Sequence, residues 1–416
     1  MTEATVRTTC CIAGGGPAGV MLGFLLARAG VGVVVLEKHK DFFRDFRGDT
    51  IHPSTLQVMH ELGLLDQFLK VPHNEVRRLH GVVGDTEVHI ADFTHLPTVC
   101  KFIALMPQWD FLEFLAEQGN RYPSFDLRME TDATDIVVEG PAGDERVVGL
   151  RAQGPDGPIE FRADLVIGAD GRHSIVRDRA GFSVENIGAP MDVLWMRLSR
   201  HESDPEQTAG YMNYGRIFVM LNRGDYWQCA FVIRKGGYDE VHSRGLDAMR
   251  GEVVRLAPFL SDRVAELQSW DEIKLLTVAI DRLRQWWRPG LLCIGDAAHA
   301  MSPIGGVGVN VAVQDAIAAA NILAAPLREG RLTTDHLAQV QKRRTFPMKV
   351  IQGMQVAVQQ NIIDKVLSSD RPITAPWTVK LFNWLPFLQR IPARVVGIGV
   401  RPEHVRTQPH APAPAV

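Results

Sequence analysis

Residues 8–38 read TTCCIAGGGPAGVMLGFLLARAGVGVVVLEK, and this stretch decides the fold of the chain. Residues 8–13 form a largely apolar, β-favouring run that is typical of a buried parallel strand. A glycine-rich turn over residues 14–19 follows, and then come an apolar run of helical length and a second strand, Val33–Leu36. The order of strand, turn, helix and strand predicts an α/β domain.

The turn carries the spacing Gly14-x-Gly16-x-x-Gly19, which a dinucleotide-binding turn requires. Gly14 permits the tight turn, Gly16 lets the backbone approach a pyrophosphate, and Gly19 allows close packing of the helix on the strand. Pro17 suits the first helical turn, because its missing N–H costs nothing there. The helix that starts around Ala18 would hold phosphates through its free N–H groups and its dipole.

Glu37 ends the second strand, 18 residues after Gly19, and is followed directly by Lys38. A carboxylate at this place can accept hydrogen bonds from an adenosine ribose, so the whole unit predicts a dinucleotide site. Arg47 lies in the polar connection that comes next, and its fork of donors could reach the pyrophosphate. A solvated surface arginine is an equally good reading of that residue.

Composition narrows the class of protein. The 416 residues allow two or three domains, and 45 basic against 48 acidic side chains give a net charge of 45 − 48 = −3. That balance provides no general attraction to nucleic acid or anionic lipid. The five cysteines (10, 11, 100, 229 and 293) show no CxxC or metal-ligand spacing. We therefore expect reduced thiols, a cytoplasmic location and no metal.

The uncharged run from Cys10 to Ala27 has the length of a membrane span. Four glycines and a proline within residues 14–19 make a poor continuous helix, and no basic region or cleavage site of a signal peptide precedes it. We expect this run to be part of a soluble core. The only low-complexity segment, 408–416, is expected to be disordered.

A second informative stretch is DLVIGADGRHSIVR, residues 164–177. It predicts a buried strand that ends in Gly-Ala-Asp170-Gly171, followed by a helix that Ser174 caps. An ordinary strand-to-helix turn without a ligand is the plain alternative.

The third stretch is residues 290–310, where a buried strand ends at Gly295-Asp296 and a glycine-rich loop follows. A long apolar helix is predicted from Val309 to Ala325, and Pro326 is expected to end it. The junction of loop and helix would direct backbone N–H groups and a positive helix end at an anionic ring or oxyanion. For His299 we prefer a buried, hydrogen-bonded imidazole to a catalytic one.

Residues 191–233 are rich in β-favouring and aromatic residues, with strands predicted at 193–198, 211–221 and 227–233 and a hairpin turn at 222–225. One face of this sheet could wall an apolar cavity, with Tyr211, Tyr214 and Trp227 as candidate substrate contacts. Alternatively, each aromatic side chain packs against the others and a covering helix. Farther along, the aromatic residues near Trp377 and Trp384 are expected to pack on the main body rather than meet a membrane or a second copy.

Taken together, the three motifs resemble the FAD-dependent monooxygenases of the para-hydroxybenzoate hydroxylase type, from Thr8 to about Glu403. The resemblance implies an α/β fold with a Rossmann-like FAD-binding domain, an inserted mixed or antiparallel β-sheet domain for the substrate, and C-terminal helices. The expected boundaries are 1–72, 100–185 and 285–340 for the FAD-binding domain, 73–99 and 186–284 for the substrate domain, 341–404 for the helical region and 405–416 for a disordered tail.

The resemblance also assigns roles to residues. The first turn and Glu37–Lys38 would bind the adenosine end of FAD, and Asp170 would serve both FAD and the incoming pyridine nucleotide. A loop without a side-chain acid or base would lie at the reacting edge of the isoalloxazine. The remaining contacts implied are Arg47 and Gln108 near the pyrophosphate and ribityl chain, Gly295 and Asp296 at the ribityl hydroxyls, and Pro303, Gly306, Gly308, Val309 and Asn310 along the isoalloxazine.

The activity implied is hydroxylation of a small aromatic or polycyclic substrate with NADH or NADPH and O2, through a flavin C4a-hydroperoxide on non-covalent FAD. Only one GxGxxG site is found, so the NAD(P)H would visit transiently. A flavin reductase or dehydrogenase without oxygen insertion and a non-catalytic FAD-fold binding protein are the alternatives. A halogenase is disfavoured, because its Trp-x-Trp-x-Ile-Pro segment is absent. We expect a monomer or homodimer with no nucleic-acid partner and no integral membrane segment.

Overall fold

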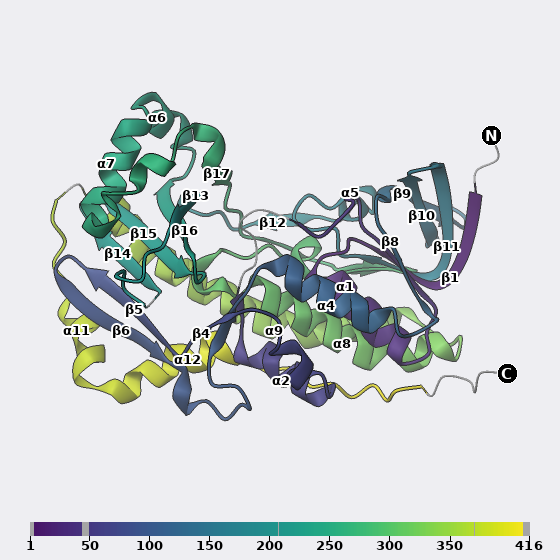
Figure 1. Cartoon of the computed structure of the whole chain (residues 1–416). Coiled ribbons are helices and arrows are strands. Elements are labelled where there is room, and N and C mark those ends of the chain that lie inside the picture. Colours follow the sequence, from purple (N-terminus) through teal and green to yellow (C-terminus); the bar gives the residue numbers. More distant parts are fainter. Residues whose placement is uncertain (1–3, 44–49, 207, 370, 411–416) are drawn as a thin grey trace.

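The computed structural model describes residues 4–43, 50–206, 208–369 and 371–410 and places two sheets next to each other over a layer of long helices (Figure 1). One sheet is mainly parallel and the other mainly antiparallel, and shorter helices follow at the C-terminus. The predicted fold class is therefore confirmed. All five cysteines are buried and unpaired, as expected for reduced core thiols.

The first sheet has a parallel centre in the order β20-β11-β1-β2-β8. β1 pairs with β2 on one side and with β11 on the other, so the crevice beside β1 lies where the strand order reverses. The antiparallel strands β19, β9 and β10 extend this sheet. The bounds are β1 Ala4–Ala13, β2 Val33–Leu36, β8 Phe125–Arg128, β9 Asp132–Glu139, β10 Arg146–Gly154, β11 Gly157–Gly168, β19 Trp287–Arg288 and β20 Leu291–Cys293.

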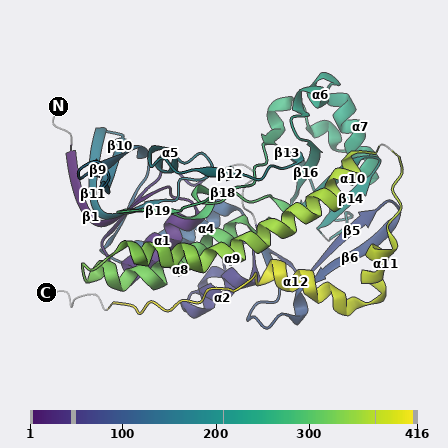
Figure 2. The ribbon, with the colours of Figure 1, turned by 180° about the vertical axis from the view of Figure 1, so that it is seen from behind.

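Four long helices pack beneath this sheet: α1 (Pro17–Arg28), α4 (Gln108–Gly119), α8 (Gly308–Arg328) and α9 (Thr334–Val358) (Figure 2). α8 is long and apolar enough to cross a membrane, but 83% of its apolar window is buried, as in the core helix of a folded domain. The helix does not end at Pro326 as predicted. A proline in the last turn removes only one hydrogen bond, so the helix continues to Arg328.

The segment 50–68 is divided into three short elements. β3 (Thr50–Ile51) comes first, α2 (Pro53–Glu61) follows, and Gly63 in a left-handed conformation (φ 72°) separates α2 from α3 (Leu65–Phe68). β3 pairs with β7 (Ile103–Leu105), which also pairs with β4 (Asn74–Val76). Other short elements are α5 Ile175–Arg179, β12 Val184–Asn186 and β18 Asp281–Leu283.

The second sheet has the order β17-β13-β16-β15-β14-β5-β6. The predicted strand 211–221 is in fact a hairpin, because Tyr214 (φ 50°) and Gly215 (φ 73°) both take the positive φ that a tight two-residue turn requires. The predicted turn at 222–225 is confirmed between β15 and β16. The bounds are β5 Arg78–Val83, β6 Thr86–Asp92, β13 Met191–Ser199, β14 Ala209–Asn213, β15 Arg216–Asn222, β16 Tyr226–Arg234 and β17 Lys274–Leu276.

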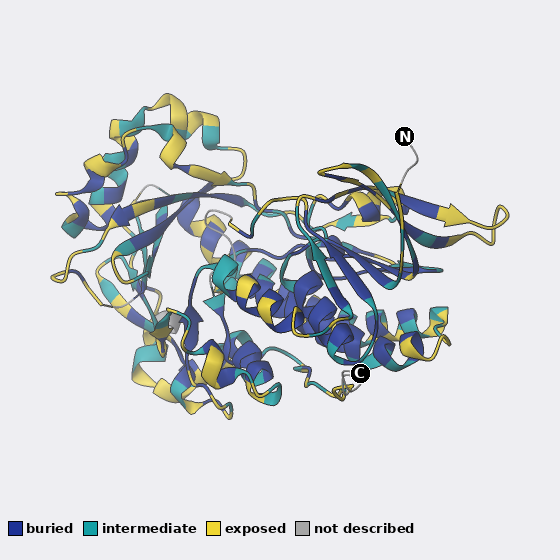
Figure 3. Ribbon diagram, turned by 45° about the vertical axis from the view of Figure 1, so that its right-hand side comes forward, coloured by how far each residue is buried: buried dark blue, intermediate teal, exposed yellow. Residues whose placement is uncertain are grey.

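The two faces of this second sheet have different covers. One face packs against α6 (Tyr238–Ser243) and α7 (Leu246–Leu256), with Phe218 and Trp227 in that core. The other face packs on Ile304 and on the region around α10 (Asp364–Leu367). Figure 3 shows the strands mostly in the dark blue of buried residues, while yellow exposed residues gather on the outer helices. The face toward Ile304 is thus the one that looks at the FAD-binding domain.

Packing of the C-terminal helices α11 (Trp377–Trp384) and α12 (Arg390–Gly397) on the main body is only partial. Asn383 on α11 accepts a hydrogen bond from the backbone N–H of His89 (2.9 Å) and donates one to the carbonyl of Glu87 (2.7 Å), which caps the edge strand β6. Trp377 and Trp384, however, are 75% and 78% exposed, so the prediction that they pack is wrong for these two side chains.

The end of the chain also differs from prediction. The segment 405–410, expected to be disordered, is held against the FAD-binding domain: Arg28 donates to the carbonyl of Thr407 (2.7 Å), and the N–H of His410 donates to the carbonyl of Arg28 (2.8 Å). Figure 2 shows this yellow segment running below α2 and α8. Residues 411–416 lie outside the described part of the chain.

Candidate functional site

The sequence motifs meet at one edge of the first sheet. Gly14 follows β1, Glu37 follows β2, Asp170 follows β11 and Asp296 follows β20, and these four strands are parallel neighbours. In open α/β sheets, ligands bind outside the carboxyl ends of the strands where the order reverses. The structure therefore brings together in space residues that are 282 positions apart in the sequence (296 − 14).

The three glycines of the first turn have different surroundings. Gly14 has φ +103°, and a Cβ there would lie 2.3 Å from the carbonyl oxygen of Ala169. A Cβ on Gly19 would lie 1.9 Å from the carbonyl oxygen of Gly14, so helix and strand pack backbone on backbone. A Cβ on Gly16 would meet nothing within 4 Å. Gly16 is thus the position at which a ligand can approach the backbone.

The N-terminus of α1 faces this open space. Pro17 lies in its first turn, and no side chain caps its free N–H groups. Unpaired N–H groups at a helix start, with the dipole behind them, bind phosphate. Ala18 and Gly19 are buried within the same turn, so the backbone here is the part of the protein that a pyrophosphate would meet.

Glu37 is held in place by the backbone. Its two carboxylate oxygens accept hydrogen bonds from the N–H of Gly15 (3.1 Å) and of His39 (3.0 Å), and the residue is 8% exposed. A Cβ on Gly15 would lie 2.7 Å from the Cβ of Glu37, so a side chain here would clash with Glu37. The GxGxxG spacing does not require a glycine at position 15, and this close approach explains why one is present. Lys38 is exposed at the turn that follows.

Asp170 is committed to the protein. The hydroxyl of Ser174 donates to its Oδ1 and the N–H of Val176 to its Oδ2 (3.2 Å), while Ser174 also caps α5 by accepting from the N–H of Arg177 (2.9 Å), as predicted. Burial raises the pKa of Asp170 in spite of these hydrogen bonds. Its backbone, rather than its carboxylate, touches the first turn, at Gly14.

Asp296 has a more open carboxylate. Its side chain is 35% exposed, and Oδ2 lies 3.9 Å from a guanidinium nitrogen of Arg172. Arg172 also donates to the carbonyl of Thr277 (3.2 Å), which ties the site to the strand region of the second sheet. Of the two predicted aspartates, Asp296 is therefore the better placed to reach a ligand.

A buried ionic cluster lies directly below Asp296. His299 Nε2 is 2.6 Å from Asp315 Oδ2, which also accepts from the N–H of Gly295 (3.1 Å), while Arg344 Nε donates to Asp315 Oδ1 (2.8 Å). His299 is 1% exposed and Asp315 fully buried, so the expectation of a buried, hydrogen-bonded imidazole is confirmed. No local sequence pattern indicates this role of Asp315, because its partner Arg344 lies 29 residues away on α9.

The loop from Pro303 to Gly308 is shaped by glycines. Gly305 (φ 77°) and Gly306 (φ 62°) both take left-handed conformations, and the hydroxyl of Thr50 donates to the carbonyl of Gly306 (2.7 Å). A Cβ on Gly308 would meet nothing within 4 Å, and no side chain caps α8, which begins there. The backbone at Gly308 is therefore open in the way that the backbone at Gly16 is.

The side chain of Asn310 is used inside the protein. Its Oδ1 accepts from the N–H of His52 (2.9 Å) and the hydroxyl of Thr55 (2.7 Å), and its Nδ2 donates to the carbonyl of Thr50 (3.1 Å). Asn310 is 5% exposed and Val309 7% exposed, so at these two positions only the backbone remains for a ligand. Asn310 thus fastens the start of α8 to β3 and α2.

Two other predicted contacts complete the set. Gln108 is half-buried at the first residue of α4, next to the end of β7. Arg47 lies outside the described residues, so its role stays a prediction.

The aromatic substrate candidates lie on the wrong face of the second sheet. Trp227 is 1% exposed and donates from Nε1 to Asp204 (2.9 Å), Tyr211 packs on the same core, and the guanidinium of Arg255 on α7 lies 3.9 Å from the ring centre of Tyr214. They pack against the covering helices, which was the alternative reading. The residues that share the face toward Ile304 are Val193, Trp195, Met212, Ile217, Val219 and Val232.

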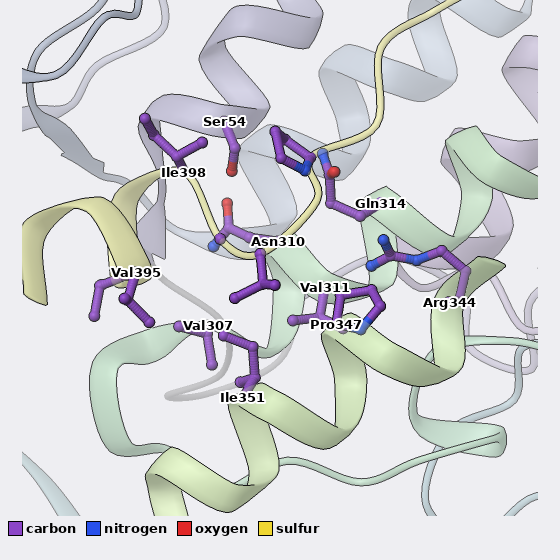
Figure 4. Close-up of a pocket in the computed structure, with 14 residues that line it drawn as sticks. Ser54, Val307, Asn310, Val311, Gln314, Arg344, Pro347, Ile351, Val395 and Ile398 are labelled. Carbon is purple, nitrogen blue, oxygen red and sulfur yellow. The ribbon is translucent and has the colours of Figure 1, made fainter. Parts of the chain in front are cut away.

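A small cavity behind Asn310 is not a second candidate for the substrate. It lies between α2, α8, α9 and residues 395–402, with Ser54, Gln314 and Arg344 on its wall (Figure 4). Its volume is about 30 Å³, room for roughly two water molecules. An aromatic substrate or a dinucleotide does not fit there.

The geometry suits FAD: an open glycine cradle, an uncapped helix start, a fixed carboxylate beyond β2 and an accessible one beyond β20. The family model described as an FAD binding domain matches residues 7–354, and the chain belongs to this family. It is a flavin-dependent monooxygenase of the class that includes para-hydroxybenzoate hydroxylase, with FAD as its cofactor.

Comparison with known proteins supports this family assignment. The chain is 32% identical over 391 residues to 6-methylpretetramide 4-monooxygenase of Streptomyces rimosus, covering 92% of each chain. Among solved structures, PqsL of Pseudomonas aeruginosa in complex with 2-aminobenzoylacetate has a TM-score of 0.74 at 23% identity, covering 86% of this chain and 97% of that one. The anhydrotetracycline hydroxylase OxyS of Streptomyces rimosus has a TM-score of 0.72 at 21% identity, covering 95% and 77%. These two structures support the fold.

Proposed function

We propose that this enzyme hydroxylates a polycyclic aromatic substrate of the polyketide kind, using O2 and NADH or NADPH. The observation that carries the proposal is the 32% identity to a 6-methylpretetramide monooxygenase, which extends over 92% of both chains. Bound FAD supplies the redox and oxygen chemistry. The residues of the chain bind it, orient it and shield the reaction from water.

The geometry supports the following binding roles. The backbone at Gly16 and the start of α1 meet the pyrophosphate, Glu37 accepts from the ribose, and Asp296 accepts from the ribityl hydroxyls. The uncapped start of α8 at Gly308 stabilises negative charge on the ring system. One such dinucleotide site is present in the sequence, so NAD(P)H binds transiently.

The face of the second sheet that looks toward Ile304 fits a flat apolar substrate. Val193, Met212 and Val219 give it a hydrocarbon surface, and Trp195 adds an aromatic ring. A surface of this kind excludes water, and water near a reactive oxygen species favours unproductive side reactions. We assign no side-chain acid or base at this face.

The test is NAD(P)H consumption by the FAD-loaded enzyme across a panel of phenols and polycyclic polyketide-type aromatics, with product masses recorded. We expect slow consumption without substrate, a sharp increase with the right aromatic, and a product heavier by one oxygen atom. The same reaction without O2 should give no such product. Full turnover with a product that lacks the added oxygen would show a reductase or dehydrogenase instead.

A further inference from the structure

Three metal-ligating side chains meet on the β5–β6 hairpin, at the edge of the second sheet. The Nδ1 atoms of His80 and His89 are 2.9 Å apart, and their rings cross at 77°. Glu87 Oε1 lies 3.5 Å from His80 Nδ1, and the ligand atoms of all three residues lie within 4.8 Å of one another. Both imidazoles therefore direct the same ring nitrogen at one point, with a carboxylate beside it.

The backbone of the hairpin produces this arrangement. His80 and His89 are direct cross-strand partners, and the pairing register shifts between Leu79 and His80. Such bulges re-aim side chains, and here the shift sets the two imidazoles opposite each other. Glu87 is two residues from His89 on β6, so the alternation of the strand places both side chains on one face.

The hairpin is held from outside by a separate set of contacts. The side chain of Asn383 binds the backbone of both Glu87 and His89, at 2.7 and 2.9 Å. On the inner side, β5 pairs with β14. The positions of the two β6 ligands therefore do not depend on the side chains of the cluster alone.

This cluster is distinct from the FAD site. His80 pairs with Ala209 on β14, two residues from Tyr211, and Tyr211 packs in the core that α6 and α7 cover. Leu79, on the opposite face, packs with Val76 and Leu105. The ligands thus lie on the face of the sheet that looks away from Ile304.

We propose that His80, His89 and Glu87 bind a divalent transition-metal ion, with zinc as the ion to test. At a metal–nitrogen distance of about 2.05 Å, two nitrogens 2.9 Å apart subtend roughly 90° at the metal, and a movement of the two rings apart by about 0.5 Å would give the tetrahedral angle of structural zinc sites. Two imidazoles and one carboxylate suit Zn²⁺, Ni²⁺ and Cu²⁺ better than Mg²⁺ or Ca²⁺. Glu87 is an outer ligand with a 64% exposed side chain, and water completes the coordination.

The bound ion joins β5 to β6 at the register shift, where backbone pairing is irregular. It therefore acts as a structural clamp on the edge of the second sheet. The expectation of no metal rested on cysteine spacing, which does not bear on a site built from histidines. A histidine pair that is nine positions apart becomes a ligand pair only through the hairpin register.

The test is isothermal titration of the EDTA-treated, FAD-containing protein with ZnCl2. We expect one site per chain in the wild type. His80→Asn and His89→Asn should each weaken binding at least about tenfold, since even loss of a group that only supports a ligand costs that much. Glu87→Gln should weaken it less, and His60→Asn, an exposed histidine on α2, should leave it unchanged.

Thermal unfolding gives a second readout, because an ion that binds only the folded state raises the melting temperature. ZnCl2 should raise it in the wild type and in His60→Asn, and less in the cluster variants. Because Glu87 is exposed, Glu87→Gln keeps this readout usable even if a histidine variant folds poorly. Absence of stoichiometric zinc binding, or equal affinity in the wild type and both histidine variants, overturns the proposal. Neither result bears on the FAD chemistry.

Discussion

At the scale of single residues, the glycines of the first turn have two different roles. Some allow the protein backbone to pack closely, and one leaves open space for a ligand. A side chain at Gly14 would strike the carbonyl of Ala169, and one at Gly19 would strike the carbonyl of Gly14. Substitutions there test the fold. A side chain at Gly16 would enter open space in front of α1, so that position tests the ligand.

We therefore predict that Gly16→Val folds normally but loses FAD. Its backbone (φ −78°) suits any residue, and the branched side chain would occupy the place of the pyrophosphate. The measurement is the flavin-to-protein absorbance ratio after gel filtration. Gly251→Val, on α7, is the matched control, because a Cβ there also meets nothing within 4 Å. Full flavin occupancy in Gly16→Val would contradict the placement of FAD.

Asp296→Ala should weaken FAD binding without unfolding the chain. The side chain is 35% exposed at the end of β20, and its partner Arg172 is 29% exposed, so water can solvate that guanidinium when the carboxylate is removed. Loss of a charge-assisted hydrogen bond costs about 1.5–3 kcal/mol, or roughly ten- to a hundredfold in affinity. Flavin fluorescence titration of the apoprotein would measure it. A variant that is clearly less stable in urea unfolding but binds FAD with normal affinity would show that Asp296 is structural.

At the scale of elements, Asp315 joins α8 to α9. One of its carboxylate oxygens contacts His299, and the other accepts a hydrogen bond from Arg344. Breaking a buried ion pair by removing one charge leaves the partner uncompensated and costs about 3–5 kcal/mol. We predict that Asp315→Asn loses about this much stability in urea unfolding. Asp156→Asn, in the exposed β10–β11 turn, should stay within about 0.5 kcal/mol of wild type. Equal stability of the two variants would contradict the role of Asp315.

The same cluster gives a pH dependence. Burial alone would raise the pKa of Asp315, but His299 and Arg344 outweigh it and hold the pKa below the usual 3.8. A depressed folded-state pKa stabilises the protein above the unfolded value and loses that contribution as the pH falls through the folded value. We predict that the stability gap between wild type and Asp315→Asn is constant near neutral pH and shrinks below about pH 3.8. A stability difference between wild type and Asp315→Asn that grows as the pH falls would contradict this prediction.

The elements also show which parts of the fold can be predicted from the sequence and which cannot. The strand–turn–helix units were readable, because glycine spacing and apolar runs are local signals. The alternation of the second sheet shows that Tyr211 and Met212 point to opposite faces, but only the packing of α7 and Ile304 decides which face meets the FAD-binding domain. Contacts between distant segments, such as that of Asp315 with Arg344 and of Asn310 with Thr55, leave no local pattern.

At the scale of the whole molecule, the end of the chain returns to its beginning. Residues 403–410 lie against α1, α2, α8 and α9, all of which belong to the FAD-binding domain (Figure 2). Glu403 is 5% exposed and pairs with Arg343 (2.7 Å) and Arg344 (3.5 Å), so the chain end contributes to the cluster around Asp315. The sequence of residues 403–410 does not indicate this packing, since the partner residues lie elsewhere in the sequence.

We predict that a chain ending at Pro402 is markedly less stable than the full chain and loses FAD at lower urea concentrations. The truncation removes a buried carboxylate from two arginines, together with the backbone hydrogen bonds to Arg28 and Glu61. Glu403→Gln isolates the charge within this effect and should cost part of the same free energy, because it leaves Arg344 less well compensated in a buried site. Glu329→Gln is the matched control: its carboxylate also pairs with an arginine, but at 43% exposure the solvent screens that pair, so the substitution should leave the stability almost unchanged. Urea unfolding followed in parallel by tryptophan and flavin fluorescence would measure all three. If the truncated chain unfolded like the wild type, residues 403–410 would only lie on the surface, and the FAD-binding domain would be complete without them.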